Sequence, residues 1–273
     1  MPAVGHARNA QLFGIAHHTL AALKETVPAR FQAAIVTQQV QSTLQQTQAA
    51  IISPMIGTLR RAMMASVARL EADLKGSRDD ASAALSAVHQ VCSHVGRYFF
   101  SSFGGSQLLP YVRELCSFIV RVFLSAAVLL KPCNEQVRMA LAQDMSTIES
   151  MLSALDSDFN SHVRHEATVL REFKKLLFAQ SLQALDFDEV ANVIPLHLLL
   201  AYLVHQLPAA VPTLPAFCGV ETSTYLEATI VPLWDDKPQD LAAFKAKIAE
   251  ISDAHNLDPT ESPVVAFIMA QTA

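Results

Sequence analysis

Apolar side chains recur at helical spacing through most of the chain. The most regular run lies in residues 135–160, where apolar positions repeat every three or four residues. These positions are Val137, Leu141, Met145, Ile148, Leu152, Leu155 and Phe159. Such a repeat places one apolar stripe on one face of a helix, as in helical bundles. No convincing alternation of apolar and polar residues indicates a strand, so the pattern predicts an all-α protein.

Proline and short polar runs divide this pattern into separate helices. We expect helices over residues 9–26, 29–52, 54–74, 85–99, 111–130, 135–160, 163–177, 193–207, 222–233, 239–253 and 262–269. Ser53-Pro54 is expected to start a new helix, because proline is tolerated in a first turn. Residues 101–110, which contain Gly104-Gly105, are expected to form a turn, and the proline-rich residues 208–215 an extended segment.

The clearest polar break is the run Lys75-Gly76-Ser77-Arg78-Asp79-Asp80. It predicts a loop between two parts of the chain. Residues 1–75 would be a helical region at the end of an upstream bundle, and residues 81–273 a C-terminal helical bundle region.

Composition narrows the function classes. Hydrophobic residues make up 51% of the 273 residues and charged residues 16%, so we expect a sizeable core and a weakly charged surface of the kind that meets other proteins. A formal net charge of −5 argues against nucleic acid as a partner. The apolar segments 115–130 and 193–207 are shorter than the roughly 20 residues of a membrane span, which predicts buried helices.

The N-terminal part carries an unusual charge bias. Residues 1–70 contain six basic residues and one acidic residue, Glu25. A transit peptide has a similar bias, but over so long a stretch amphipathic helices with glutamine-rich polar faces are the favoured interpretation. The four cysteines form no Cys-x-x-Cys pair and are expected to be free thiols at core positions.

The sequence contains no glycine-rich phosphate loop, no Gly-x-Ser-x-Gly and no His-Glu-x-x-His. We therefore expect no catalytic site, no cofactor, no metal and no small-molecule substrate. One cluster offers an alternative to this expectation: Asp158, His162, His165 and Glu166 lie at helical spacing, so the two histidines could share a face and reach one metal ion. Polar positions on the solvent side of an amphipathic helix are the favoured interpretation.

Two features are weak candidates for partner contact. The pair Arg60-Arg61 would suit an acidic surface or lipid headgroups, and a solvated helix face explains it equally well. Trp234 is the only tryptophan, and tryptophan is enriched in interface hot spots. Packing between terminal helices is at least as good an explanation of Trp234.

Three sequence blocks resemble the C-terminal region of subunit five of the conserved oligomeric Golgi complex. The first is Leu130-Lys131-Pro132 followed by Val137-Arg138-Met139-Ala140-Leu141-Ala142-Gln143-Asp144-Met145. The second is Leu170-Arg171-Glu172-Phe173-Lys174-Lys175-Leu176-Leu177-Phe178, and the third is Val193-Ile194-Pro195-Leu196, which precedes an apolar helix. The order and spacing of the three blocks agree with that family, over roughly residues 85–270.

The chain also departs from the family. Cys133-Asn134-Glu135 stands where the family has a glycine-containing turn, and Lys174-Lys175 replaces an Arg-Pro pair. Family members are several times longer and have an N-terminal region with an assembly coiled coil. The chain is therefore expected to be a truncated or divergent member.

The resemblance implies an elongated stack of helical bundles of the type found in multisubunit tethering complexes. It implies a non-catalytic subunit that acts in intra-Golgi retrograde vesicle transport, peripheral on the cytoplasmic face of the Golgi membrane with a cytosolic pool. Its partners would be the other subunits of the complex, especially subunit seven. The alternative is a helical adaptor of another trafficking pathway that binds short peptide motifs.

Overall fold

The computed structural model of the chain is built from helices, and the residues it describes contain no strand, which confirms the all-α prediction. It describes residues 38–67, 69–70, 105–131, 134–155, 159–179, 181–182 and 185–272, with scattered positions before residue 29 and between residues 85 and 93. The α-helices are α3 (Gln38–Val67), α6 (Gly105–Ala127), α7 (Glu135–Leu155), α8 (Phe159–His162), α9 (Arg164–Leu177), α10 (Phe187–Ala191), α11 (Leu196–Gln206), α12 (Leu214–Phe217), α13 (Thr222–Tyr225), α14 (Pro238–Ala254) and α15 (Pro263–Thr272). A π-helix, η2 (Leu226–Ile230), and a 3₁₀-helix, η3 (Val231–Asp235), connect α13 to α14.

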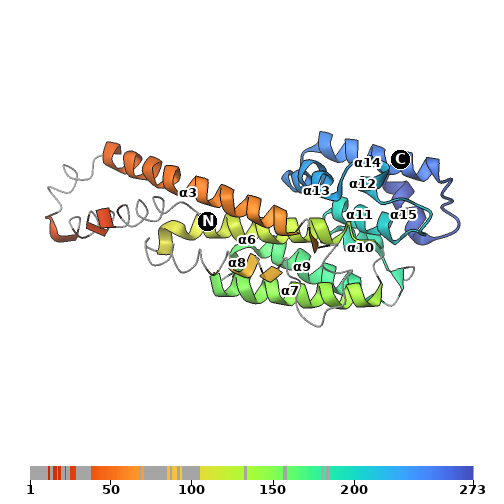
Figure 1. The fold of residues 1–273 in the computed structure, drawn as a ribbon, viewed down its shortest axis with the longest axis horizontal. Coiled ribbons are helices and arrows are strands. Elements are labelled where there is room, and N and C mark those ends of the chain that lie inside the picture. The colour runs from red at the N-terminus through yellow and green to blue at the C-terminus, as the bar shows by residue number, and fades with distance from the viewer. Residues whose placement is uncertain are drawn as a thin grey trace.

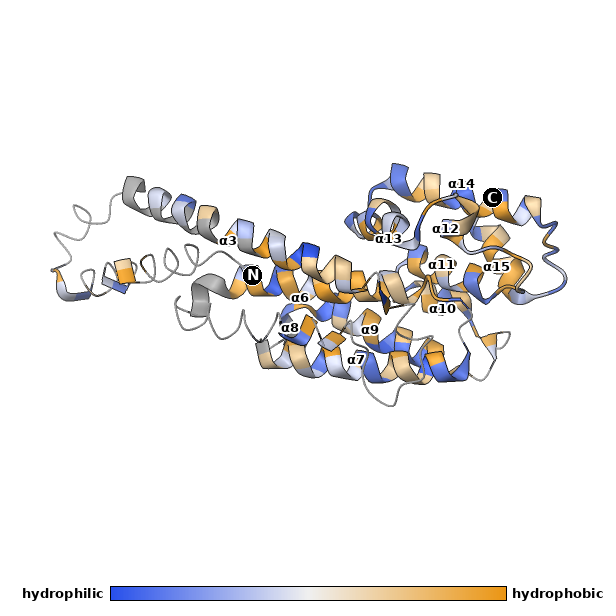
Figure 2. Ribbon diagram, viewed as in Figure 1, coloured by the Kyte–Doolittle hydropathy of each residue, from blue (hydrophilic) through white to orange (hydrophobic). Residues whose placement is uncertain are grey.

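The long helices α3, α6 and α7 run lengthwise through the molecule, and α10 to α15 gather at one end (Figure 1). Helix α6 lies at the centre, where it packs against α3, α7, α9 and η3. Figure 2 shows apolar residues where α6 meets α3 and in the group around α11 and α15. The arrangement is a helical bundle with one core that continues into its compact end.

Helix α6 is apolar on more than one face, because neighbours cover it on several sides. Leu115, Ile119 and Phe123 form one buried row, and Val120 and Leu124 extend it around the helix. A helix that is apolar nearly all round belongs in a core. The two predicted buried helices are confirmed, although α6 ends at Ala127 rather than at residue 130 and α11 covers Leu196–Gln206 of the predicted residues 193–207.

The expected helix boundary at Ser53-Pro54 is wrong. Helix α3 continues through Pro54, although the proline ring removes the hydrogen bond that residue 54 would donate to the carbonyl of Ala50. Ile52 and Ile56 on either side of the proline are buried, in a helix that packs along α6. Tertiary burial of both halves therefore outweighs one missing backbone hydrogen bond.

Two further boundaries differ from the pattern-based prediction. Residues 105–110, expected in a turn, form the start of α6 despite Pro110. The helix expected over residues 135–160 ends at Leu155, and residues 159–162 form the separate helix α8. The apolar spacing continues past the end of α7. Such spacing shows which face of a helix is buried, but it does not show at which residue the helix ends.

The compact end begins with a capped helix. The carboxylate of Asp186 accepts hydrogen bonds from the backbone N–H groups of Asp188 and Glu189 and so caps α10. In residues 208–215, expected to be extended, α12 already starts at Leu214. Lys131 anchors the segment between α11 and α12, because its Nζ donates hydrogen bonds to the carbonyls of Pro208 and Val211 at 3.2 and 2.7 Å.

The predicted division at residues 75–80 lies outside the described residues. Helix α3, from the first predicted part, packs along α6 of the second. Of the helices that the structure describes, none combines the length and the apolar character needed to cross a membrane.

Candidate functional site

The two adjacent arginines of α3 have different surroundings. Arg60 forms an ion pair with Glu114 of α6, and its guanidinium carbon lies 5.0 Å from the ring centroid of Phe118. Arg61 is exposed and donates a hydrogen bond of 3.2 Å to Thr58 of its own helix. Arg60 therefore joins α3 to α6, whereas Arg61 is the member of the pair that presents its charge to solvent. Partner contact through either residue stays a prediction.

Trp234 of η3 is turned inward and is only 9% exposed. Its indole Nε1 donates a hydrogen bond of 2.9 Å to Ser125 Oγ of α6. The guanidinium of Arg121 lies 5.4 Å from the indole centroid, and the rings of His165 and His197 meet it edge-on at 6.4 and 5.5 Å between centroids. The indole thus packs against α6, α9 and α11. A role of Trp234 as a partner anchor stays a prediction, and little of the side chain is exposed for such a contact.

Glu166 of α9 lies beside this tryptophan cluster as a buried carboxylate. It accepts hydrogen bonds from Ser117 Oγ at 2.5 Å and from Nε and Nη2 of Arg121 at 3.0 and 2.7 Å. Burial alone would raise the pKa of Glu166, but the hydrogen bonds from Ser117 and Arg121 outweigh it and hold the pKa below its ordinary value. The carboxylate is therefore charged and fixes α9 to α6.

The residues of the candidate metal cluster do not share one helix face. His162 belongs to α8, His165 is exposed on α9, and Val163 stands between the two helices. Glu166, expected on the solvent side, is instead buried against α6; Asp158 lies outside the described residues. Across the part of the chain that the structure describes, no three His, Cys, Asp or Glu side chains are grouped to hold a metal ion.

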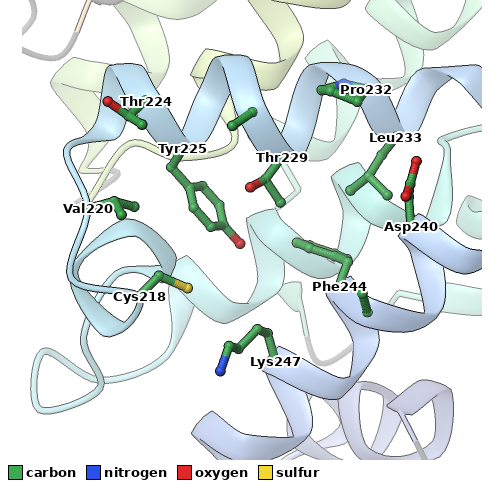
Figure 3. A pocket seen from close by; sticks show the side chains of 12 residues that line it. Cys218, Val220, Thr224, Tyr225, Thr229, Pro232, Leu233, Asp240, Phe244 and Lys247 are labelled. Atoms are coloured by element: carbon green, nitrogen blue, oxygen red, sulfur yellow. The ribbon is translucent and has the colours of Figure 1, made fainter.

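A cleft of about 430 Å³ opens between the segment 218–233 and α14 (Figure 3). Part of its wall is the π-helix η2, which directly precedes η3. Pro232 has no N–H for the carbonyl of Ala228, and its ring would clash with that carbonyl in a regular α-helix. A wider turn before Pro232 avoids the clash, and π-turns are frequent at functional sites.

The walls of this cleft are mostly apolar. They include Val220, Ala228, Pro232, Leu233, Ala243 and Phe244. Asp240 and Lys247 lie at opposite ends, seven residues apart on α14, and Cys218 lies at the same end as Lys247 (Figure 3). The cleft therefore combines an apolar body with one acidic and one basic end.

Tyr225 points its ring into the cleft (Figure 3). The residue is 4% exposed, and its hydroxyl is buried without a hydrogen-bond partner. Burial is the main cause that raises the pKa of Tyr225 and also that of the Cys218 thiol, so both groups stay protonated at neutral pH. A neutral phenol offers a cleft-facing O–H donor.

Sequence reasoning named Trp234 and Glu166 separately, but it predicted neither the cleft nor the polar contacts of these two residues with α6. Tyr225, Cys218 and Lys247 come from separate elements with no motif spacing, and so do Ser125 and Glu166. The one available signal was the isolated proline of residue 232 inside a helical pattern, which indicates a distorted helix.

Comparison of the chain with protein-family models, with curated proteins and with solved structures gave no match.

Proposed function

We propose that the chain is a non-catalytic subunit of a vesicle-tethering complex at the Golgi that acts in intra-Golgi retrograde transport. The observation that carries this proposal is that the three blocks resembling the tether subunit lie on α7, on α9 and at the start of α11, in one connected core. The burial of residues from all three blocks in one core supports the proposal.

The packing of residues in the blocks supports this step. Leu141 and Met145 of the first block are fully buried on α7, which packs against α9. Phe173 of the second block is fully buried on α9 and meets the ring of Tyr202 on α11 edge-on, at 5.4 Å between centroids. Ile194 of the third block is 1% exposed. These four residues of the blocks, Leu141, Met145, Phe173 and Ile194, are thus packing residues, whereas Met139 and Phe178 of the same blocks are exposed.

A tether of this kind works through geometry and adhesion. We propose that the lengthwise helices α3, α6 and α7 form part of an elongated stack of bundles that holds binding surfaces apart, where many weak contacts add through avidity. The other subunits of the complex, subunit seven above all, would be the partners, and membrane association would be peripheral. Arg61, exposed on α3, is the residue that we propose contacts a partner subunit.

The decisive experiment is affinity purification of the tagged chain from its own cells, with identification of the proteins that co-purify. We expect the other Golgi tether subunits, and we expect Golgi staining that becomes diffuse when a partner subunit is depleted. Recovery of a different trafficking assembly would instead support the adaptor alternative. Diffuse staining that does not respond to depletion contradicts the tether assignment.

A pair of charge reversals tests the proposed contact. Arg61→Glu should reduce recovery of the partner subunits, because it inverts a solvent-facing charge. Arg164→Glu inverts another exposed arginine charge, on α9 and outside the three blocks, and serves as the matched control. Equal recovery of the partner subunits with both variants would contradict a role for Arg61. Membership of the complex is tested separately, by the affinity purification of the unmodified chain.

A further inference from the structure

The cleft beside α14 has the size and lining of a ligand site. Its volume of about 430 Å³ falls within the roughly 300–1,000 Å³ typical of small-molecule pockets, which are mainly apolar with a few placed polar groups. Leu233 and Phe244 form buried apolar wall, and Ala228 and Ala243 leave space open at the surface. An apolar chain would be covered on both sides by these walls.

The buried hydroxyl of Tyr225 gives the cleft a specific polar requirement. A buried O–H without a partner loses the hydrogen bond it had with water. Figure 3 shows this hydroxyl directed toward the end of the cleft where Cys218 and Lys247 lie. An oxygen acceptor placed there would satisfy the group. The phenol is neutral at physiological pH, so it serves as a donor to that acceptor.

The charges at the two ends set the orientation of such a ligand. Lys247 Nζ pairs with Glu250 Oε2 at 2.5 Å and lies 6.0 Å from the ring centroid of Phe217. An ammonium has three donors, so one pair with Glu250 leaves capacity for an anion. Asp240 at the far end repels a carboxylate, whereas the carboxylate of Glu250 is already paired with the ammonium of Lys247. The anionic head therefore belongs at the Lys247 end, and the apolar tail runs toward Leu233.

The geometry points to a binding site for a medium-chain acyl carboxylate, whose head accepts a hydrogen bond from Tyr225 and pairs with Lys247 while its chain lies against Leu233 and Phe244. This site is independent of the tether assignment, because it rests on other residues and needs no partner subunit. Either proposal can fail while the other holds.

Titration calorimetry of the purified full chain with decanoate tests the site. We expect saturable binding at one site per chain. Tyr225→Phe should weaken it about threefold to tenfold, which corresponds to the loss of one hydrogen bond. Lys247→Met should weaken decanoate binding and leave binding of decanol unchanged, because decanol carries no charge for the ammonium to pair with.

Two alanines of α14 provide a matched pair of variants. Ala243 lines the cleft and Ala242 does not, although both are exposed on the same helix. Ala243→Phe should fill the cleft and abolish binding, whereas Ala242→Phe should bind as the wild type does, with circular dichroism confirming the helix content of each. Absence of saturable binding by the wild type, or unchanged binding by Ala243→Phe, would overturn the site.

Discussion

Trp234 Nε1 donates a 2.9 Å hydrogen bond to Ser125 Oγ, which joins two positions 109 residues apart in the chain. The contact connects the 3₁₀-helix η3 at the compact end to the central helix α6. Arg121, one turn before Ser125 on α6, lies over the same indole and also binds Glu166 of α9. One polar cluster thus ties the compact end and α9 to the long central helix.

Ser125→Ala tests the hydrogen bond in this cluster. The side chain of Ser125 is fully buried, so the variant leaves the indole N–H without an acceptor at a cost of roughly 1–3 kcal/mol in the free energy of unfolding. Urea denaturation followed by far-ultraviolet circular dichroism measures the change. In a Trp234→Phe background the same substitution should cost much less, because no N–H is left unpaired. Equal costs in both backgrounds would show that the hydrogen bond contributes nothing.

Arg121→Met tests the ion pair with Glu166. It leaves a carboxylate that is 6% exposed with Ser117 as its remaining side-chain donor. Removing one partner of a fully buried pair costs roughly 3–5 kcal/mol, and because about a third of the Arg121 side chain is exposed we expect about 2 kcal/mol. Adding Glu166→Gln should recover most of this loss in the same denaturation assay. Wild-type stability of the single variant would contradict the proposed role.

Two buried histidines make the fold sensitive to acid. Burial lowers the pKa of His197 to about 4, and burial with the nearby charge of Lys131 lowers that of His205 to about 4. The unfolded chain, with histidine near pH 6.5, binds more protons between these values, so the free energy of unfolding falls as the pH drops below about 6.5. Each histidine contributes up to about 3 kcal/mol to this fall.

The pH dependence is measured by urea denaturation at several pH values from 7.5 to 4.5. The contribution of Glu166, whose pKa is lowered in the fold, begins to be lost only near the ordinary carboxyl pKa of 4.5, at the lower end of this range. His197→Phe should flatten part of the profile, because it removes one of the two titrating histidines. The residue packs edge-on against Trp234, and a phenyl ring keeps an aromatic contact there. The exposed Ala242 provides the control, since Ala242→Phe adds a phenyl ring without removing a titratable group and should leave the slope unchanged. A wild-type profile that is flat from pH 6.5 to 4.5 would contradict the prediction.

Arg60 and Arg61 form a natural comparison on one helix. Arg60→Ala removes the ion pair with Glu114 and the contact with Phe118, and we expect a loss of about 1 kcal/mol. Arg61→Ala removes an exposed side chain and should change stability by less than about 0.5 kcal/mol. Thermal unfolding of the two variants side by side measures the difference. An equal effect would mean that the pairing across α3 and α6 has no energetic value.

Helical spacing of apolar residues predicted most of the core before the fold was known. Leu141, Met145, Ile148 and Leu152 were expected on one stripe, and all four are buried on α7. The stripe is a local property, because residues three and four apart on a helix share a face whatever lies opposite. Helix ends were less well predicted, since the cost of Pro54 could be judged only against the burial of Ile52 and Ile56.

The sequence by itself determined that the chain is helical and which residues of α6, α7 and α11 are buried. Only the tertiary structure decided that Trp234 faces Ser125, that Glu166 turns inward to Arg121, and that Tyr225 lines a cleft. The physical reason is the range of the interactions. Periodicity reports which face of a helix is apolar, whereas the partner of a buried polar group is chosen by whichever distant segment packs against that face.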